Sequence, residues 1–462
     1  MSVVDANKKL LELVSQRLLE LENDQILEKN KVLEEIHDLK SDIAEIIQQQ
    51  DSARTHLPEK NPPKKSSTQI DAKQLLEMIK SNEIVIQGCK LDTAIKYLTE
   101  DHLVGSNKNV IFGCDVGDIP CPPKEINALK FVPAKHAKRT LYEAAVHKLL
   151  CEEIVIAKMA PGIVKFKDLF GCHLRNAVRY FEKNNTNSGV ELSQQLQKIF
   201  GGNDTVLAIV TEKMDTDMTH FFELYDKLVA SNAKFQRLVL GKNQEDVFIS
   251  LIFQILITLL CIQCKFPEFR HNDLHFGNVF VSTNLETIDL TMDGSQYLRY
   301  IVSNHSNGRT MFFDIPYCGL LAKMGDFGLS NLSNQDGYQT PENFKHYDKS
   351  WGLTLTANHF YDYYVFLAHA VGEISFHQKN MPNFLNFIKS VIPITRGRNP
   401  VNIWKGDGKN TRLPVDYQES VAANHKWPTI MQLLLHPLFA KFVSDGQRVV
   451  AIENTFVIDL QH

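Results

Sequence analysis

The chain has 462 residues, of which 44% are hydrophobic and 23% are charged, which suits a globular protein of two or three domains. Its formal net charge of −4 counts against direct binding of nucleic acid through bulk charge. The eight cysteines are scattered and form no disulfide framework, so we expect a reducing, intracellular compartment.

Residues 1–55 predict one long helix with a hydrophobic stripe. Apolar residues recur at alternating steps of three and four, and the two runs of this pattern are offset by a stutter. The stripe consists of Leu11, Val14, Leu18, Leu21, Ile36, Leu39, Ile43 and Ile46. We expect a coiled coil that joins copies of the chain into a homo-oligomer or docks it to a partner. A helix folded back on the rest of the chain remains the alternative. Nothing in the charged first residues resembles a secretion signal.

Residues 56–68 are expected to be a linker, because they are rich in proline, lysine and serine and contain few apolar residues. Residues 69–101 form a helical lead-in with two short helical patterns, the second of which runs from Thr93 to Leu98.

The next part of the chain alternates between strand patterns and a helix. Residues 103–113 read as a strand, a turn at Gly105-Ser106 and a second strand. Ala128-Leu129-Lys130-Phe131 predicts another strand, and a helical pattern runs from about Lys138 to Met159. A continuous apolar strand follows at 205–210 and ends in Thr211-Glu212.

Residues 247–264 are an uncharged stretch of eighteen residues. A membrane-spanning helix needs about 20 apolar residues, and this stretch is interrupted by polar residues such as Gln254 and Thr258. A helix buried on all sides in a large domain has the same composition, so we expect a buried helix and no membrane span. Cys261 and Cys264 then are buried helix residues rather than zinc ligands.

Two short motifs after this helix carry the candidate chemistry. The first is His271-Asn272-Asp273-Leu274-His275-Phe276-Gly277-Asn278, followed by the apolar strand Val279-Phe280-Val281. The second is Gly325-Asp326-Phe327-Gly328, which follows another apolar strand. Asp273 can accept the proton of a hydroxyl nucleophile, while Asn278 and Asp326 can hold a metal ion. These are the parts that phosphoryl transfer from Mg-ATP requires.

The two motifs resemble the H-R-D-L-x-x-x-N and D-F-G motifs of the protein-kinase superfamily, in the same order. With His275 and Gly277, the first is most similar to the virion serine/threonine kinases of poxviruses and related large DNA viruses, such as iridoviruses. The resemblance covers residues 102–445. It implies an α+β, bilobal protein-kinase-like fold with a β-rich N-lobe at 102–213 and an α-helical C-lobe at 214–462, preceded by the N-terminal coiled-coil helix.

The same resemblance implies the activity. The enzyme would transfer the γ-phosphate of ATP to serine or threonine hydroxyls of protein substrates, viral or virion proteins among them, with Mg²⁺ or Mn²⁺ as metal cofactor. We expect it in the cytoplasm of a host cell, with packaging in virions as a further expectation.

Nucleotide contacts follow from the resemblance in the N-lobe. Gly105-Ser106 would lay backbone N–H groups over the ATP phosphates. Lys130 would bind the α- and β-phosphates and pair with a glutamate on the next helix, for which Glu143 is the first choice and Glu152 the rival. Glu212 belongs to the hinge whose backbone would hold adenine.

The sequence leads to a specific expectation at each of three positions in the expected C-lobe. Asn272 stands where most kinases have an arginine that binds a phosphorylated activation segment, so a phosphate on Ser330 or Ser333 should not switch the enzyme on. His275 replaces a lysine beside the transferring phosphate, and is assigned as catalytic together with Asp273. Asp362 opens an apolar helix, and should accept hydrogen bonds from the catalytic-loop backbone.

An insertion lies between the two motifs, and it leaves alternatives open. Residues 297–302 and 310–313 predict a β-hairpin there. Asp289 could replace Asp326 as metal ligand, since small-molecule kinases of the aminoglycoside and choline type have a similar loop followed by Ile-Asp. Such a kinase is one alternative function. A pseudokinase scaffold that acts through the coiled coil is another, because only Gly105 of the glycines usual in a phosphate-binding turn is evident. Residues 433–439 are expected to form the closing helix of the C-lobe.

Overall fold

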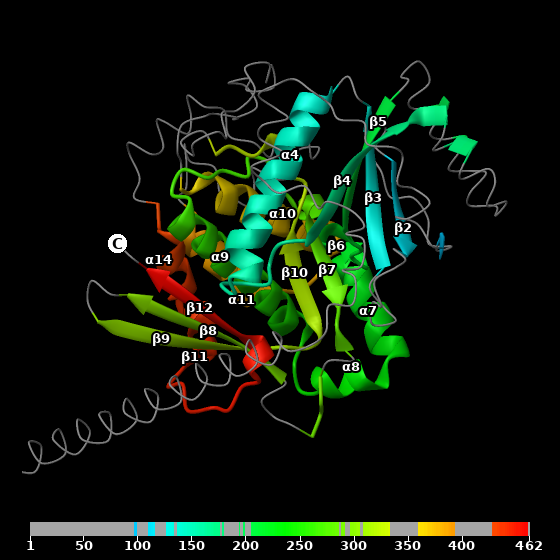
Figure 1. The fold of residues 1–462 in the computed structure, drawn as a ribbon. Coiled ribbons are helices and arrows are strands. Elements are labelled where there is room, and N and C mark those ends of the chain that lie inside the picture. Colours follow the sequence, from blue (N-terminus) through cyan, green and yellow to red (C-terminus); the bar gives the residue numbers. More distant parts are fainter. Residues whose placement is uncertain are drawn as a thin grey trace, which may run out of the picture. The chain divides into compact units, whose positions relative to one another are not determined.

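The computed structural model describes residues 97–98, 110–115, 126–133, 136–175, 178–179, 194, 197–198, 205–285, 288–291, 296–304, 308–332, 359–392 and 427–460. These residues form a mixed α+β fold with several sheets and helices, as expected (Figure 1). The expected coiled coil at 1–55, the linker at 56–68 and the turn at Gly105-Ser106 lie outside the described residues.

A five-stranded antiparallel sheet comes first in the described chain, in the order β1-β2-β3-β5-β4. Its strands are β1 (Tyr97–Leu98), β2 (Val110–Asp115), β3 (Ile126–Pro133), β4 (Phe166–His173) and β5 (Thr205–Glu212). The expected strands around Lys130 and at 205–210 are therefore confirmed as β3 and β5. The helical pattern expected around Leu98 is wrong at Tyr97–Leu98, because these residues pair with β2 as a short edge strand.

One helix packs against this sheet. α4 (Ala137–Leu150) continues directly into a π-helical turn at Cys151–Ile156, which confirms most of the helix expected from Lys138 to Met159. At this junction the His147 side chain lies 2.5 Å from the carbonyl oxygen of Val164, and the Cys151 thiol donates to the same oxygen. α4 also contacts β4 and the turn after Asp326, so it connects the sheet to the second sequence motif (Figure 1).

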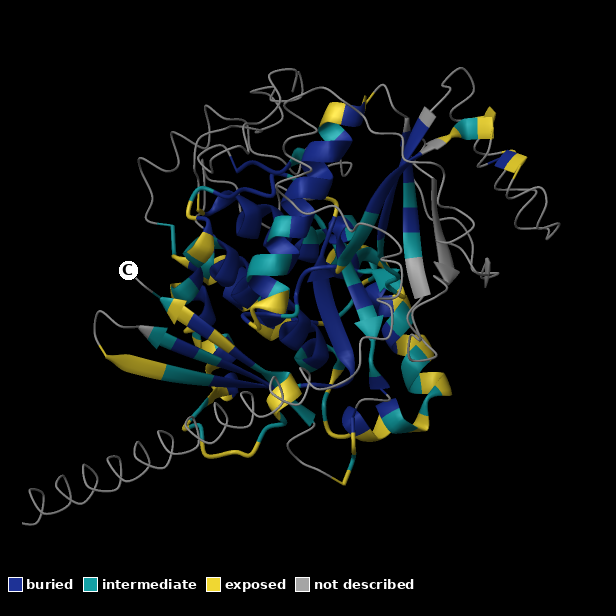
Figure 2. Ribbon diagram, viewed as in Figure 1, coloured by how far each residue is buried: buried dark blue, intermediate teal, exposed yellow. Residues whose placement is uncertain are grey.

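α9 (Gln244–Lys265) is the central helix of the remaining part and is buried along most of its length (Figure 2). It is long and apolar enough to cross a membrane, but 89% of its most apolar window is buried inside the protein. The Thr258 hydroxyl donates to the Gln254 carbonyl within the helix (2.7 Å), whereas the Gln254 side chain bonds to a neighbouring strand. Gln254 donates to the carbonyl of Leu320 (3.2 Å) and accepts from the amide of Ala322 (3.0 Å). Gln254, one of the polar interruptions of the apolar pattern, thus positions the strand that leads to Asp326.

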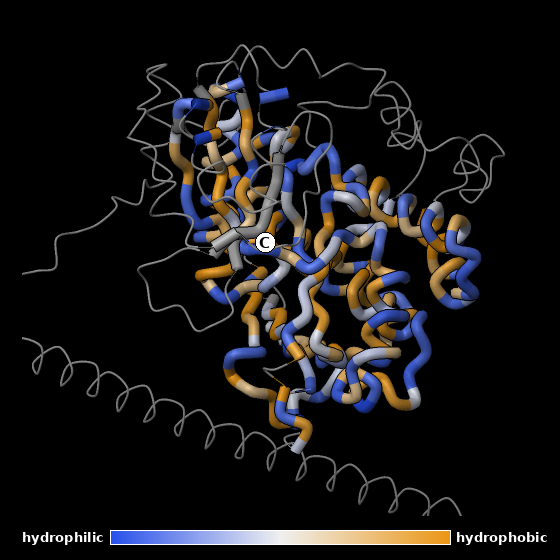
Figure 3. The backbone as a smooth tube through the Cα atoms, turned by 90° about the vertical axis from the view of Figure 1, so that its right-hand side faces the viewer, coloured by the Kyte–Doolittle hydropathy of each residue, from blue (hydrophilic) through white to orange (hydrophobic). Residues whose placement is uncertain are grey.

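Further helices pack around α9. They are α7 (Phe221–Ser231), α8 (Ala233–Leu238), α10 (Tyr361–Phe376), α11 (Pro382–Val391) and α14 (Ile430–Leu434). Aromatic rings fill the contacts: the Phe248 ring of α9 lies 5.7 Å from that of Phe222 and 5.1 Å from that of Phe384. Figure 3 shows hydrophobic and hydrophilic residues closely interspersed along the tube, and the buried apolar residues come from most of the described helices and strands.

A three-stranded antiparallel sheet carries both sequence motifs at the same end. It contains β6 (Thr216–Asp217), β7 (Val279–Thr283) and β10 (Leu320–Met324), in the order β10-β7-β6. Val279, directly after Asn278, lies opposite Met324, two residues before Asp326. The strands expected on either side of the insertion are therefore confirmed, and their pairing brings the two motifs together.

The insertion itself forms the expected hairpin, β8 (Tyr297–Asn304) with β9 (Arg309–Pro316). The C-terminal part of the chain adds β11 (Val443–Ser444) and β12 (Thr455–Leu460) to it, giving a four-stranded sheet in which β12 runs parallel to β8. The closing helix expected at 433–439 is wrong after Leu434, where α14 ends. Pro437 opens a separate 3-10 turn there, since proline cannot continue an α-helix.

A buried ion pair holds the hairpin together, and it allows a prediction. Arg299 donates two hydrogen bonds to Asp314, at 2.7 and 2.8 Å, and the Asp314 side chain is 1% exposed. Asp314→Ala leaves the guanidinium buried without this partner, so it should lower the free energy of unfolding by about 3–5 kcal/mol in denaturant titrations. Glu453→Ala, which removes an exposed carboxylate in the same sheet region, is the control. Equal stability of the two variants would contradict the prediction.

Candidate active site

The loop between α9 and β7 is closed by its own hydrogen bonds. The amide group of Asn278 donates to the Asp273 carbonyl oxygen (2.9 Å), and the backbone N–H of His275 donates to the same oxygen (2.8 Å). The Asp273 side chain is 18% exposed and Asn278 is buried. Asp273, His275 and Asn278 are therefore held within one short, ordered loop.

Asp362 of α10 fixes the start of this loop. Its two carboxylate oxygens accept the backbone N–H groups of His271 (2.7 Å) and Asn272 (2.9 Å), and the residue is 4% exposed. The role expected for Asp362 from the sequence is confirmed. Asn272 has a backbone φ of +63°, a left-handed conformation that asparagine tolerates better than most residues.

The hydrogen bonds of His275 determine where its proton lies. Its Nδ1 accepts the backbone N–H of Gly277 (3.0 Å), so in the neutral ring the proton is on Nε2, which lies 3.8 Å from the Asp273 carboxylate. A Cβ atom at position 277 would lie 2.9 Å from the His275 ring, so a residue larger than glycine would collide with that ring in this position. On the other side the ring of His369 in α10 lies 5.4 Å away. His275 thus presents an N–H group toward Asp273.

Three charged residues from three elements meet at the second motif. Lys130 of β3 donates from Nζ to Glu143 of α4 (2.7 Å) and to Asp326 after β10 (3.0 Å). Burial alone would lower the pKa of Lys130, but the two carboxylates raise it above its ordinary value. Burial alone would raise the pKa of Asp326, but the Lys130 ammonium holds it at about 2. Lys130 is therefore charged and Asp326 ionised throughout the neutral pH range.

Asp326 lies beside Asn278 and remains accessible. The backbone N–H of Gly325 donates to the Asn278 carbonyl oxygen (3.0 Å), and the Asp326 side chain is 42% exposed. Asp326 has a φ of +56°, a conformation that costs energy in a non-glycine residue and is frequent at functional sites. The carboxylate of Asp326 and the amide oxygen of Asn278 are hard oxygen donors, the type that Mg²⁺ prefers. These two residues fit a magnesium site.

The rival residues make other contacts. Glu152 pairs with Lys148 at 3.7 Å. The exposed Asp289 accepts hydrogen bonds from the backbone and the hydroxyl of Thr291, at 2.8 and 2.7 Å. Glu143 and Asp326, and not these rivals, contact Lys130. Gly105 and Ser106 lie outside the described residues.

Glu212 ends β5 and links the strand to its surroundings. Its carboxylate accepts from the Nζ of Lys323 (2.7 Å) and from the backbone N–H of Lys165 (2.7 Å). The Glu212 side chain is thus engaged in holding β5 against β10 and the loop before β4.

Phe327 lies between two histidines, and one of them gives a pH prediction. Its ring is 5.0 Å from that of His147 in α4 and 5.1 Å from that of His271 in the loop. Burial lowers the pKa of His147 from 6.5 to about 4, so the folded protein keeps this ring neutral where the unfolded chain protonates it. This contribution to stability is complete above pH 6.5 and is lost as the pH falls toward 4.

The measurement is the melting temperature between pH 7 and pH 4 for the wild type and for His147→Gln. Glutamine keeps a donor for the Val164 carbonyl but does not titrate, so the variant should lose less stability in acid than the wild type. Parallel curves for the two proteins would contradict the prediction.

Arg139 was not singled out from the sequence. It lies one turn before Glu143 on α4, and its Nε donates to the Gly328 carbonyl oxygen (3.1 Å). The i, i+4 spacing to Glu143 was the available signal, because residues so spaced share a helix face. Because Arg139 shares a helix face with Glu143, the partner of Lys130, it could have been expected to lie near Asp326.

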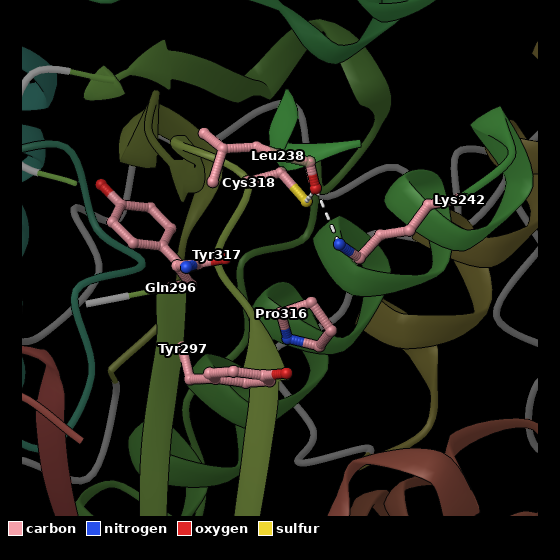
Figure 4. A pocket seen from close by; sticks show the side chains of 7 residues that line it. All are labelled: Leu238, Lys242, Gln296, Tyr297, Pro316, Tyr317 and Cys318. Carbon is pink, nitrogen blue, oxygen red and sulfur yellow. Dashed lines mark hydrogen bonds between the residues drawn. The ribbon is translucent and has the colours of Figure 1, made fainter. Parts of the chain in front are cut away.

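A small cavity lies at the base of the inserted hairpin, where β8 and β9 meet the loop after α8 (Figure 4). It encloses about 20 Å³, room for roughly one water molecule. Lys242, which lines it, donates to the Leu238 carbonyl (2.7 Å). The residues around the cavity are not those of the site described above, so it does not belong to that site.

Comparison with known proteins supports a kinase relationship. No protein-family model matches the sequence. Two proteins of Acanthamoeba polyphaga mimivirus, both provisionally named as serine/threonine-protein kinases, are similar to parts of it. One is 27% identical over 202 residues, which are 42% of this chain and 37% of that protein. The other is 32% identical over 85 residues, which are 18% of this chain and 19% of that protein.

The chain therefore matches well under two thirds of either relative. A closer similarity to the virion kinases of poxviruses and iridoviruses stays a prediction. By sequence, the chain is related to protein kinases over about two fifths of its length.

Proposed function

We propose that this protein is a kinase that transfers the γ-phosphate of ATP to serine or threonine hydroxyls of protein substrates. The observation that carries the proposal is the position of Lys130, whose Nζ contacts both Glu143 and Asp326. A lysine between a helix glutamate and a metal-binding aspartate is the arrangement that phosphoryl transfer by protein kinases requires. In this proposal the five-stranded sheet with α4 is the N-lobe, and the part built around α9 is the C-lobe.

Asp273 orients the attacking hydroxyl and accepts its proton. Its place at the centre of a loop held by Asp362 and by Asn278 supports this role, because general base catalysis requires an accurately positioned acceptor. His275 presents its Nε2–H toward Asp273 and, as a hydrogen-bond donor, stabilises charge on the transferring phosphoryl group. A lysine at this position would add a full positive charge, so the histidine provides less charge stabilisation.

Asn278 and Asp326 hold Mg²⁺ or Mn²⁺, and Lys130 binds the ATP phosphates while Glu143 keeps it in place. A bound Mg²⁺ neutralises charge that develops on the phosphates during transfer. Asp326 suits this role because it is ionised and partly open to solvent. We assign the phosphate-covering turn to Gly105-Ser106 and an adenine contact to the Glu212 backbone, on the basis of the family resemblance alone.

A small-molecule kinase is the second candidate function, favoured by the His275-to-Asn278 sequence. The position of Asp326 beside Lys130 counts against it, since the similar small-molecule enzymes would use an aspartate at the place of Asp289. ATP consumption by the purified chain should be compared with a mixture of proteins and with amino alcohols and aminoglycosides. Consumption stimulated only by proteins is expected. Stimulation only by the small molecules would overturn the protein-kinase proposal, and no nucleotide binding at all would favour a pseudokinase scaffold.

Residues 1–55 are proposed to associate with a second copy of the chain. Each leucine or isoleucine of the stripe buried in a coiled coil contributes about 1.5–3 kcal/mol, so the stripe from Leu11 to Ile46 can support association at micromolar concentration. Deleting residues 1–55 should convert an oligomer to a monomer in sedimentation and leave ATP turnover largely unchanged. Leu18→Lys, in the middle of the first run, should weaken association in the full chain. A full chain that sediments as a monomer would contradict this proposal.

The proposed location is the cytoplasm of a host cell, and viral or virion proteins are the proposed substrates. Both follow from the family resemblance, to which the mimivirus relatives lend support.

A further inference from the structure

Residues 327–332, here called the post-Asp326 segment, are held by side chains from two other elements. Three successive carbonyl oxygens in it accept side-chain hydrogen bonds. The Phe327 oxygen accepts from the Ser330 hydroxyl (2.6 Å), the Gly328 oxygen from Arg139 Nε (3.1 Å) and the Leu329 oxygen from Asn272 Nδ2 (3.0 Å). Every carbonyl of this short 3-10 turn thus has a donor at a defined position.

The next residues of the segment are fixed as well. Asn331 exchanges two backbone hydrogen bonds with Arg270, the residue before the catalytic loop, at 2.7 and 3.1 Å. The Leu332 N–H donates to the hydroxyl of Tyr142 in α4 (3.1 Å). Contacts to α4 at Gly328 and Leu332 therefore flank the contacts of Leu329 and Asn331 to Asn272 and Arg270, at the start of the catalytic loop.

Charge reinforces the first of these contacts. A Cβ atom at Gly328 would lie 3.1 Å from the Glu143 carboxylate, 3.3 Å from the Arg139 guanidinium and 3.3 Å from the Asp326 carboxylate. Arg139 therefore stands with Glu143 and Asp326 around a single glycine. Its positive charge lowers the pKa of Asp326, in addition to the larger effect of Lys130.

We propose that Arg139 and Asn272 are positioning residues that hold the post-Asp326 segment, and through it the Asp326 carboxylate, in place for catalysis without a phosphorylated activation segment. This rests on the proposed function only in the role given to Asp326. Arg139 reaches the segment from α4, so the same contact also keeps Glu143 near Lys130. Asn272 carries no charge to bind a phosphate and instead donates to the segment itself.

Ser330 is consistent with this arrangement. It is fully buried and its hydroxyl donates to Phe327, so a phosphate on Ser330 would disrupt the turn that the two residues form. The burial of Ser330 agrees with the sequence expectation that a phosphate at this position does not switch the enzyme on. Ser333 lies outside the described residues.

The experiment compares Arg139→Ala, Arg139→Lys and Asn272→Gly with the wild type in the full-length chain. Glycine at 272 keeps the left-handed backbone while removing the side-chain donor. Lys138→Ala is the matched control, since Lys138 is an exposed cation on the same turn of α4. Two readouts are used: kcat with KM for ATP, and amide hydrogen exchange of peptides covering residues 327–332.

Arg139→Ala and Asn272→Gly should exchange the amides of this segment at least about tenfold faster than the wild type, because those amides are protected only while the segment stays docked. Their kcat should fall by about tenfold to a hundredfold, since the misplaced group is Asp326. Arg139→Lys should recover part of the exchange protection and part of the kcat, and Lys138→Ala should match the wild type.

Phosphatase treatment of the wild type should leave kcat unchanged. The proposal is overturned if Arg139→Ala and Asn272→Gly keep wild-type exchange in this segment, or if phosphatase treatment removes activity that autophosphorylation restores. The exchange readout does not require catalysis, so it still tests the proposal if the chain fails to phosphorylate any protein.

Discussion

Asp326→Asn is expected to lower phosphoryl transfer by about a thousandfold or more while the protein stays folded. Asparagine keeps the size of the side chain but removes the negative charge that faces Lys130 and, in the proposed mechanism, the metal ion. Lys130 retains Glu143 at 2.7 Å, so its charge remains paired after the substitution. The rate of phosphate transfer and the melting temperature of the variant should be measured side by side.

The control for this substitution is Asp289→Asn, at the rival position for the metal ligand. Asp289 is exposed and accepts hydrogen bonds from Thr291, so its loss should change the rate by less than about twofold. If Asp289→Asn abolishes transfer while Asp326→Asn does not, the metal site belongs to the small-molecule type and the assignment of Asp326 is wrong.

Asp362→Ala should have the second large effect, on both stability and activity. The substitution leaves the N–H groups of His271 and Asn272 buried without their acceptor, which costs about 1–3 kcal/mol for each group. The loop that carries Asp273 loses its anchor to α10 at the same time. We expect a clear fall in the free energy of unfolding, and a fall in kcat that persists at temperatures where the variant remains folded.

Ser375→Ala, which removes an exposed hydroxyl from the same helix, is the matched control and should behave like the wild type. Asp362→Asn keeps one acceptor oxygen, so its stability and its kcat should be intermediate between those of the alanine variant and the wild type. Wild-type kcat in folded Asp362→Ala would show that the loop does not depend on this anchor.

The parts of the fold that follow from local sequence were predictable. α9 is uncharged and mostly apolar over eighteen residues, and β7, β10 and the β8–β9 hairpin show clear strand patterns, so their approximate positions could be read directly. Tyr97–Leu98 could not be read as a strand, because a two-residue strand is too short to show a period of two and is defined by its pairing with β2. The end of α14 could have been read from Pro437, which cannot continue an α-helix. β12 shows alternating burial, but its parallel pairing with β8 joins residues distant in sequence and does not follow from that pattern.

The same distinction applies to the site. Asp273, Asn278 and Asp326 could be named because each stands in a motif whose spacing is fixed by the chemistry. The choice between Glu143 and Glu152 stayed open in the sequence, because both follow Lys130 within one helical pattern and only the direction of the helix relative to β3 separates them. The i, i+4 spacing to Glu143 points to Arg139 as a cation near the site, but its hydrogen bond to the Gly328 carbonyl cannot be read from a side-chain motif.

The most direct test of the account is transfer of radiolabelled phosphate from ATP to protein, by the wild type and by Asp273→Ala, followed by phospho-amino-acid analysis. The wild type should label serine or threonine, and the variant should lose about 10²–10⁴-fold of the rate while still binding ATP, because the substitution removes the base and leaves Lys130 and Asp326 in place. Unlabelled protein with the wild type, label on tyrosine alone, or an undiminished rate with Asp273→Ala would contradict the proposed function.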